Sequence, residues 1–130
     1  MVDHEKNKSQ SEILVKQIEE FVTYLSVEKN YAQNSIASYE RDLLKFLSFL
    51  INRNIADWLE IESDTVNLFV MGLRHSEMSG KSIRRYLSSI RGFFNFLIDN
   101  GVMVKNPALS IQTPKIDRVL PKTIDFDDLR

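Results

Sequence analysis

Residues 79–97 read SGKSIRRYLSSIRGFFNFL, and the spacing of the apolar residues in this stretch predicts a long amphipathic helix. At about 100° per residue, five apolar side chains fall within about 80° of one another and form a stripe. They are Ile83, Leu87, Ile90, Phe94 and Leu97. We expect the helix to run from about residue 81 to residue 100, where Gly101 is placed to end it in a left-handed conformation.

The same helix would carry a basic face, centred about 140° from the apolar stripe. This face holds four cations, two small residues and an amide: Lys81, Arg84, Arg85, Ser88, Arg91, Gly92 and Asn95. No acid follows before Asp99, whereas surface helices usually mix charges to gain ion pairs one turn apart. The planar fork of arginine suits phosphates and guanine edges, and small side chains would let the helix approach a groove. The face favours contact with a nucleic acid, and a merely solvated surface is the alternative.

The charge of the 130-residue chain is distributed unevenly, although its net value is only −1. Residues 1–78 contain 8 Lys/Arg and 13 Asp/Glu. Residues 79–122 contain 8 Lys/Arg and only two acids, Asp99 and Asp117. The near-neutral total therefore conceals a basic carboxy-terminal third, which is typical of a surface that faces a polyanion.

Outward from this stretch, hydrophobic periodicity predicts three further helices. The first covers residues 11–28; the second runs to about Asn52 and could be capped by Asn34 or Ser35. The third opens at Ser63, after a connection in which Trp58 would be a packing anchor. No strand-type alternation is present. We therefore expect an all-α, four- to five-helix orthogonal bundle over residues 11–108, preceded by a disordered amino terminus at residues 1–10.

The three prolines, Pro107, Pro114 and Pro121, all lie after residue 106 and predict an extended segment. We expect residues 109–130 to form a linker toward another domain, with a new helix starting in residues 123–130.

The predicted second helix has a weaker polar face. Asn34, Ser38, Arg41 and Lys45 lie within about 60° of one another, and Glu40 and Asp42 flank them. Alone, this is an ordinary solvated face. Together with the basic face of residues 81–95, it could be the second arm of a grip on one duplex, with the amino-terminal N–H groups of both helices available to phosphates.

Several kinds of site are excluded or disfavoured by composition. The chain has no cysteine, which excludes disulfides and thiolate zinc sites, and His4 and His75 lack ligand spacing. None of the four tyrosines has a histidine and arginine constellation beside it in sequence, and Tyr39 and Tyr86 are expected in the core or at its boundary. No apolar run approaches the roughly 20 residues of a membrane helix, and no signal peptide is evident. We expect no cofactor, no metal, no membrane and a cytoplasmic location.

Segments throughout the chain resemble the Xer-type tyrosine site-specific recombinases of the phage integrase family. These segments are residues 21–28 (FVTYLSVE), 35–46 (SIASYERDLLKF), 79–97, Asn106-Pro107-Ala108, Pro114-Lys115 and Leu120-Pro121-Lys122. The resemblance covers about residues 13–130, and the order and spacing of the segments make it specific. The family often has Ser-Pro before its second helix, whereas Tyr31-Ala32-Gln33 fills that place here.

The resemblance implies an amino-terminal, SAM-like core-binding domain that clamps double-stranded DNA together with a catalytic domain. It implies DNA contacts from the helices that lie against the major groove and from the linker. The first group is Lys81, Arg84, Arg85, Ser88 and Arg91, the second is Ser35, Ser38, Arg41 and Lys45, and the third is Lys115, Arg118 and Lys122.

The resemblance also implies an inert fragment of an active parent, somewhat closer to XerC than to XerD. The tyrosine that forms a 3′-phosphotyrosyl link, with its arginine and histidine partners, would lie beyond Arg130. Related recombinases would pair on adjacent half-sites and form a tetramer that recombines two duplexes.

Two other interpretations remain. A helical protein–protein interaction module could use residues 79–122 to bind an acidic partner. A helix-turn-helix regulator is disfavoured, because the breaks at residues 29–33 and 76–80 lack the tight spacing of that motif.

Overall fold

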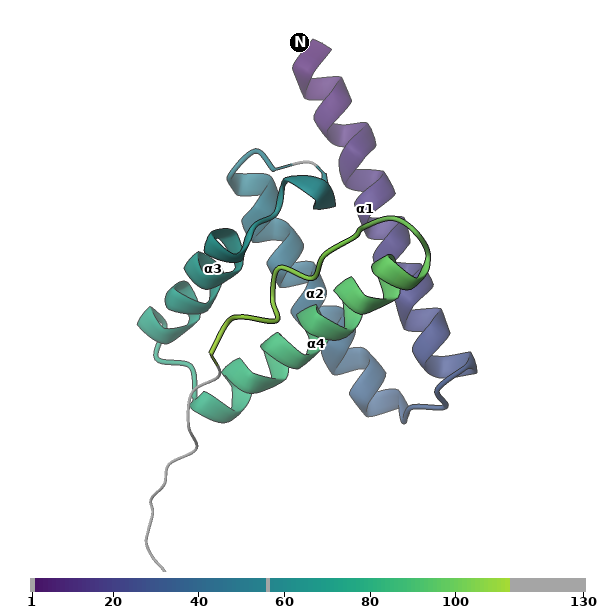
Figure 1. The fold of residues 1–130 in the computed structure, drawn as a ribbon, viewed down its shortest axis with the longest axis vertical. Coiled ribbons are helices and arrows are strands. Elements are labelled where there is room, and N and C mark those ends of the chain that lie inside the picture. Colours follow the sequence, from purple (N-terminus) through teal and green to yellow (C-terminus); the bar gives the residue numbers. More distant parts are fainter. Residues whose placement is uncertain (1, 56, 113–130) are drawn as a thin grey trace, which may run out of the picture.

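The computed structural model describes residues 2–55 and 57–112, and the side chains of the first helix from Glu12 onward (Figure 1). In this part of the chain the elements are α1 (Val2–Val27), α2 (Gln33–Asn52), the 3-10 turn η1 (Trp58–Glu60), α3 (Ser63–His75) and α4 (Gly80–Asp99). No strand occurs among them, so the expected all-α bundle is confirmed. In Figure 1, α4 crosses α2, with which it is in contact, and α1 packs along α2.

The helix ends follow local sequence, with one correction. Neither Asn34 nor Ser35 caps α2, because the helix already begins at Gln33 and Ala32 occupies the cap position. The Ile36 N–H already donates to the Ala32 carbonyl at 3.0 Å, which places both polar residues inside the first turn. At the carboxy-terminal end of α4, Gly101 adopts a left-handed conformation with φ +78°, as predicted.

The first helix is longer than the sequence suggested. It begins at Val2, so it includes residues 2–10, which were expected to be a disordered amino terminus. This stretch contains neither glycine nor proline and includes good helix formers, so the backbone can continue in the amino-terminal direction from the packed part of the helix. That packed part buries Leu14, Ile18, Phe21 and Leu25.

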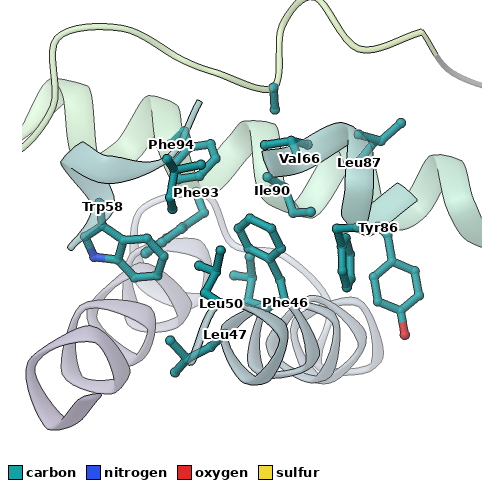
Figure 2. Packing of buried hydrophobic residues seen from close by; sticks show 14 of the residues in the cluster. Phe46, Leu47, Leu50, Trp58, Val66, Tyr86, Leu87, Ile90, Phe93 and Phe94 are labelled. Carbon is teal, nitrogen blue, oxygen red and sulfur yellow. The ribbon is translucent and has the colours of Figure 1, made fainter. Parts of the chain in front are cut away.

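The predicted apolar stripe of α4 is buried along its whole length and forms the centre of the core. Around it lie aromatic rings from every other element, several of them in edge-to-face pairs. Figure 2 shows Phe46 of α2 and Trp58 of η1 beside Phe93 and Phe94 of α4. Phe46 of α2 lies 5.0 Å from Phe69 and 6.1 Å from Phe94, measured between ring centroids. Trp58 is 2% exposed, lies 4.9 Å from Phe93, and donates its indole N–H to Gln17 of α1. The anchoring role predicted for Trp58 is therefore confirmed.

Residues 101–112 return along α4 instead of leaving the bundle directly (Figure 1). Met103, Pro107, Ala108 and Ile111 are buried there. The linker was expected to extend from residue 109, but burial of Ile111 and hydrogen bonds from α4 keep residues 109–112 on the domain. Residues 113–130, with Lys115, Arg118 and Lys122, lie outside the described part of the chain.

Candidate nucleic-acid interface

A partly buried ion pair joins α2 to α4 between the two predicted basic faces. Asp42 of α2 is only 1% exposed and accepts hydrogen bonds from Nε and Nη2 of Arg85, at 2.9 and 2.8 Å. The Ser89 hydroxyl donates to the same carboxylate at 3.1 Å. Arg–carboxylate pairs bound through two parallel N–H groups are strong and directional. The pair therefore fixes Arg85 at the helix crossing, while 41% of its side chain remains exposed.

Cations from both helices gather around Tyr86 at this crossing. The Lys45 Nζ lies 5.9 Å from the ring centroid and the Arg85 Cζ lies 5.3 Å from it, both within cation–π range. Burial and then the Asp42 carboxylate raise the pKa of Tyr86, and the charges of Arg85 and Arg41 oppose that rise. The structure thus brings the basic faces of α2 and α4 to one place, which sequence alone could only suggest.

The first turns of α4 extend this cationic surface. Lys81 and Ser88 are exposed and Arg84 is half-buried, and none of the three has a side-chain hydrogen bond or ion pair with another described residue. The helix start is fixed by Ser79, whose hydroxyl accepts the Ser82 N–H at 3.1 Å. Lys81 and Arg84 therefore keep their donors available for an external ligand.

The amino-terminal half of α2 supplies smaller polar groups. Ser35 is exposed in the first turn, and Ser38 is half-buried and accepts a hydrogen bond from Arg41 Nη2 at 3.3 Å. Arg41 itself is exposed. We refer to Ser35, Ser38, Arg41, Lys45, Lys81, Arg84, Arg85 and Ser88 together as the α2/α4 surface.

Arg91 has a different environment from the rest of the predicted basic face. Its Nε donates to the Ala108 carbonyl at 2.9 Å and its Nη2 donates to the Ile111 carbonyl. Asn106 completes the contact, since its Nδ2 donates to the Arg91 carbonyl at 3.1 Å and to Asn95 Oδ1 at 2.9 Å. Arg91 is half-buried, and its first partners are the backbone of residues 108–111.

The described residues offer no other obvious chemistry. Among them, no group of three or more His, Cys, Asp or Glu side chains could hold a metal ion. No helix in the described part is long and apolar enough to cross a membrane.

Comparison with known proteins identifies the family of this chain. Residues 18–101, more than half of the chain, match the family described as "Phage integrase, N-terminal SAM-like domain". The chain belongs to that family. The match spans α2, α3, α4 and most of the packed part of α1, so it includes every described residue of the α2/α4 surface.

Curated relatives of this integrase amino-terminal domain carry recombinase names. The chain is 34% identical over 108 residues to "Tyrosine recombinase XerC" of Herpetosiphon aurantiacus, and 35% identical over 113 residues to "Tyrosine recombinase XerD" of Listeria monocytogenes. It is 31% identical over 112 residues to the XerC of Shigella flexneri. These matches cover 83%, 86% and 86% of this chain but only 35%, 38% and 38% of the relatives.

The chain therefore spans little more than a third of the length of these curated relatives. XerC and XerD proteins match almost equally well, so identity does not separate the two types. No solved structure matches the integrase domain significantly.

Sequence reasoning missed the role of Asp42, which appeared to be an acid that dilutes the basic face of α2. A signal was present, because Tyr39 and Phe46 lie three residues before and four residues after Asp42 and share its side of the helix. A buried acid on the core side of an amphipathic helix requires a partner that pairs with its charge. In this integrase domain that partner is Arg85.

Proposed function

We propose that this integrase domain binds double-stranded DNA through the α2/α4 surface, as the DNA-gripping part of a site-specific tyrosine recombinase. The observation that carries the proposal is the Arg85–Asp42 ion pair, in which Asp42 is buried and also accepts a hydrogen bond from Ser89. This pair locks two helices so that exposed cations of both lie around one ring, Tyr86.

The chemistry of the surface suits a duplex. An α-helix fits the major groove, and the cations Lys81, Arg84 and Arg85 on α4 can reach phosphates or guanine edges. Arg41 and Lys45 on α2 add a second set of cations beside them. We expect most contacts to be made with phosphates, which set the position of the domain on DNA, and fewer with base edges.

Three residues of the linker, Lys115, Arg118 and Lys122, would continue the contact along the DNA backbone. Arg91 is also predicted to contact DNA. It can do so only through the guanidinium N–H groups that do not bond the Ala108 and Ile111 carbonyls. Its main contribution in our proposal is to hold residues 108–111 against α4.

We infer that the role of this chain is binding and not strand cleavage. Tyr86 is the tyrosine with arginines beside it, yet it is only 7% exposed, and burial raises the pKa of its hydroxyl. Both properties oppose its use as a nucleophile. In a full recombinase, catalysis and assembly with related protomers on adjacent half-sites would depend on additional residues.

The proposal is tested by fluorescence anisotropy of a labelled duplex over a salt series. About 4–7 phosphate contacts would give a slope of log K against log salt of about −4 to −6. The variant Lys81→Ala/Arg84→Ala removes two cations that have no described partner, and its slope should become shallower by about two. Arg85 and Arg91 are unsuitable for this first test because both also hold the fold.

The matched control is Lys16→Ala/Arg74→Ala, which removes two exposed cations from α1 and α3. It loses the same charge but should keep nearly all of the affinity. A second variant, Arg41→Ala/Lys45→Ala, examines the contribution of α2. If the α4 double variant and the control bind duplex DNA equally, or the wild-type domain binds none at low salt, the proposal is wrong and binding of an acidic protein becomes the leading function.

A further inference from the structure

A groove lined by tyrosines opens beside the α2/α4 surface. It lies between the carboxy-terminal end of α1, the connection to α2, and the middle of α4, and has a volume of about 400 Å³. We name it the tyrosine groove, and its lining includes Tyr24, Tyr31, Tyr39, Ser88, Gly92 and Asn95. Its volume lies in the range of small-ligand sites in proteins.

The walls of the groove are aromatic. The Tyr31 and Tyr39 rings lie 5.9 Å apart, tilted by 56°, and the Tyr24 and Phe96 rings lie 5.1 Å apart. Tyr31 is 42% exposed and does not belong to the hydrophobic core, although its ring contacts Tyr39. A flat aromatic ligand could therefore stack on a ring that the core does not need.

Polar groups stand at the edges. Ser88 is exposed and has no side-chain partner among the described residues. Asn95 accepts a hydrogen bond from Asn106 through Oδ1, so its amide N–H groups remain donors. Lys29 places its Nζ 6.0 Å from the Tyr24 ring and also lines the groove. Asp99 lines the groove as well, so the charge of Lys29 is offset by an acid. Hydrogen-bond donors and acceptors around stacking faces match the edges of a nucleobase.

Gly92 lies at the point where α4 lines the groove. A glycine in a helix interior costs about 1 kcal/mol relative to alanine. The fold does not require it here, because a Cβ at this position would meet Phe21 Cζ at 3.5 Å, an ordinary contact. A larger side chain at this position would instead occupy space in the groove.

We propose that the tyrosine groove accepts an unpaired nucleobase, which stacks on Tyr31 and is bound at its edge by Ser88 and Asn95. The inference rests on the proposed function, because Ser88 belongs both to the α2/α4 surface and to the groove, and Tyr39 lies one turn before Asp42. Two sources could supply this chemistry: an extrahelical base of the bound DNA, or a free nucleotide.

The test compares three labelled duplexes of one sequence in the anisotropy assay: fully paired, with one bulged adenine, and with an abasic bulge. Stacking of one base on an aromatic side chain should make binding of the adenine bulge about 5- to 100-fold tighter. The abasic bulge keeps the flexibility of the DNA without the base, so it should bind like the paired duplex.

Variants locate the effect. Tyr31→Ala and Gly92→Leu should both lose the preference for the adenine bulge, whereas Tyr31→Phe should keep it. Paired-duplex affinity should change less than about twofold in the two Tyr31 variants. Thermal melting verifies that each variant is folded. A titration with dAMP, followed by amide chemical shifts at Ser88, Asn95 and Tyr39, tests the free-nucleotide source.

The outcomes separate this inference from the proposed function. Shifts with dAMP that Gly92→Leu abolishes, without any bulge preference, identify a free nucleotide as the source. A preference that the abasic bulge shares shows that DNA flexibility is its cause, and one that Tyr31→Ala retains shows that the base is bound elsewhere; either result overturns the inference. Tight, salt-dependent binding of paired duplex with neither bulge preference nor dAMP shifts overturns the inference alone. Absence of any duplex binding overturns the proposed function, and the dAMP titration still decides whether the groove binds a base.

Discussion

Replacing Arg85 with alanine leaves a buried carboxylate with a single hydroxyl partner. In the wild-type protein Asp42 is 1% exposed and accepts two N–H groups from Arg85 and one O–H from Ser89. Replacing Asp42 with asparagine breaks the same ion pair from the other side. It leaves a guanidinium whose side chain is 41% exposed and can be hydrated. The two substitutions should therefore differ in cost.

The magnitude follows from the burial of the two partners. Removing one partner of a fully buried ion pair costs about 3–5 kcal/mol of unfolding free energy. Solvent reaches Arg85, which weakens the pair, so we expect about 3 kcal/mol for Arg85→Ala. We expect about 1–2 kcal/mol for Asp42→Asn, because the asparagine oxygen still accepts one hydrogen bond. The apolar pair Asp42→Leu/Arg85→Met should be close to wild type in stability, since both buried charges are removed together.

Urea denaturation followed by helical circular dichroism and by fluorescence provides the assay. Trp58 is the single tryptophan, is buried, and contacts Phe93, so its emission reports on the core directly. The double variant Arg85→Ala/Asp42→Asn completes a cycle from which the coupling energy is obtained. If the slope of the unfolding free energy against urea concentration is unchanged, the unfolded state is the same in all variants.

Equal costs for Arg85→Ala and Asp42→Asn would refute this reasoning. A cost below about 1 kcal/mol for Arg85→Ala would refute it as well, because Asp42 would then be hydrated or re-paired. Either result would also remove the main support for a rigid α2/α4 surface. DNA affinity of Asp42→Leu/Arg85→Met then distinguishes the two roles of Arg85, since this pair should keep the stability but lose one cation.

Three further predictions concern other parts of the domain. Arg91→Ala should cost about 2–3 kcal/mol and speed amide exchange in residues 103–112, because two backbone carbonyls lose a charged donor; hydrogen exchange with mass detection measures this. Burial, then the Asp42 carboxylate, raises the pKa of Tyr86 above 10.0, so the stability from this group is present below pH 10 and is lost as pH rises through the folded-state pKa. Tyr86→Phe should accordingly flatten the decline in unfolding free energy between pH about 9 and about 11. Phe94→Ala, at a fully buried position, should cost about 3–5 kcal/mol in urea denaturation, and a cost near 1 kcal/mol would place the core elsewhere.

Much of the fold could be predicted because it depends on local periodicity. The apolar stripe of α4 and the left-handed Gly101 follow from residues within one or two turns of one another. The start of α2 was less predictable, since Ala32 caps it only through its backbone, whereas Asn34 and Ser35 carry the stronger sequence signal.

The candidate site was only partly predictable because its key contacts join distant residues. Asp42 and Arg85 are 43 positions apart, and the sequence around each residue does not indicate that the two helices cross there. The partners of Arg91 are backbone carbonyls, which every residue possesses, so no side-chain pattern could identify them. The polar residues of a helix can be assigned to a face from sequence, but their partners depend on tertiary structure.

The cations of α4 show why this distinction matters for function. A helical projection places Lys81, Arg84, Arg85 and Arg91 on one face, but the neighbours of the helix change along its length. Near its start, Lys81 and Arg84 form no side-chain hydrogen bond or ion pair with a described residue. Its middle crosses α2 at Asp42, and its next turns are covered by residues 106–111. The same face therefore has three functions. Lys81 and Arg84 are available to a ligand, Arg85 joins α4 to α2, and Arg91 binds the backbone of residues 108–111. The free energy of DNA binding should come mainly from Lys81 and Arg84 and from the cations of α2, whereas Arg85 determines how the two sets of cations are oriented.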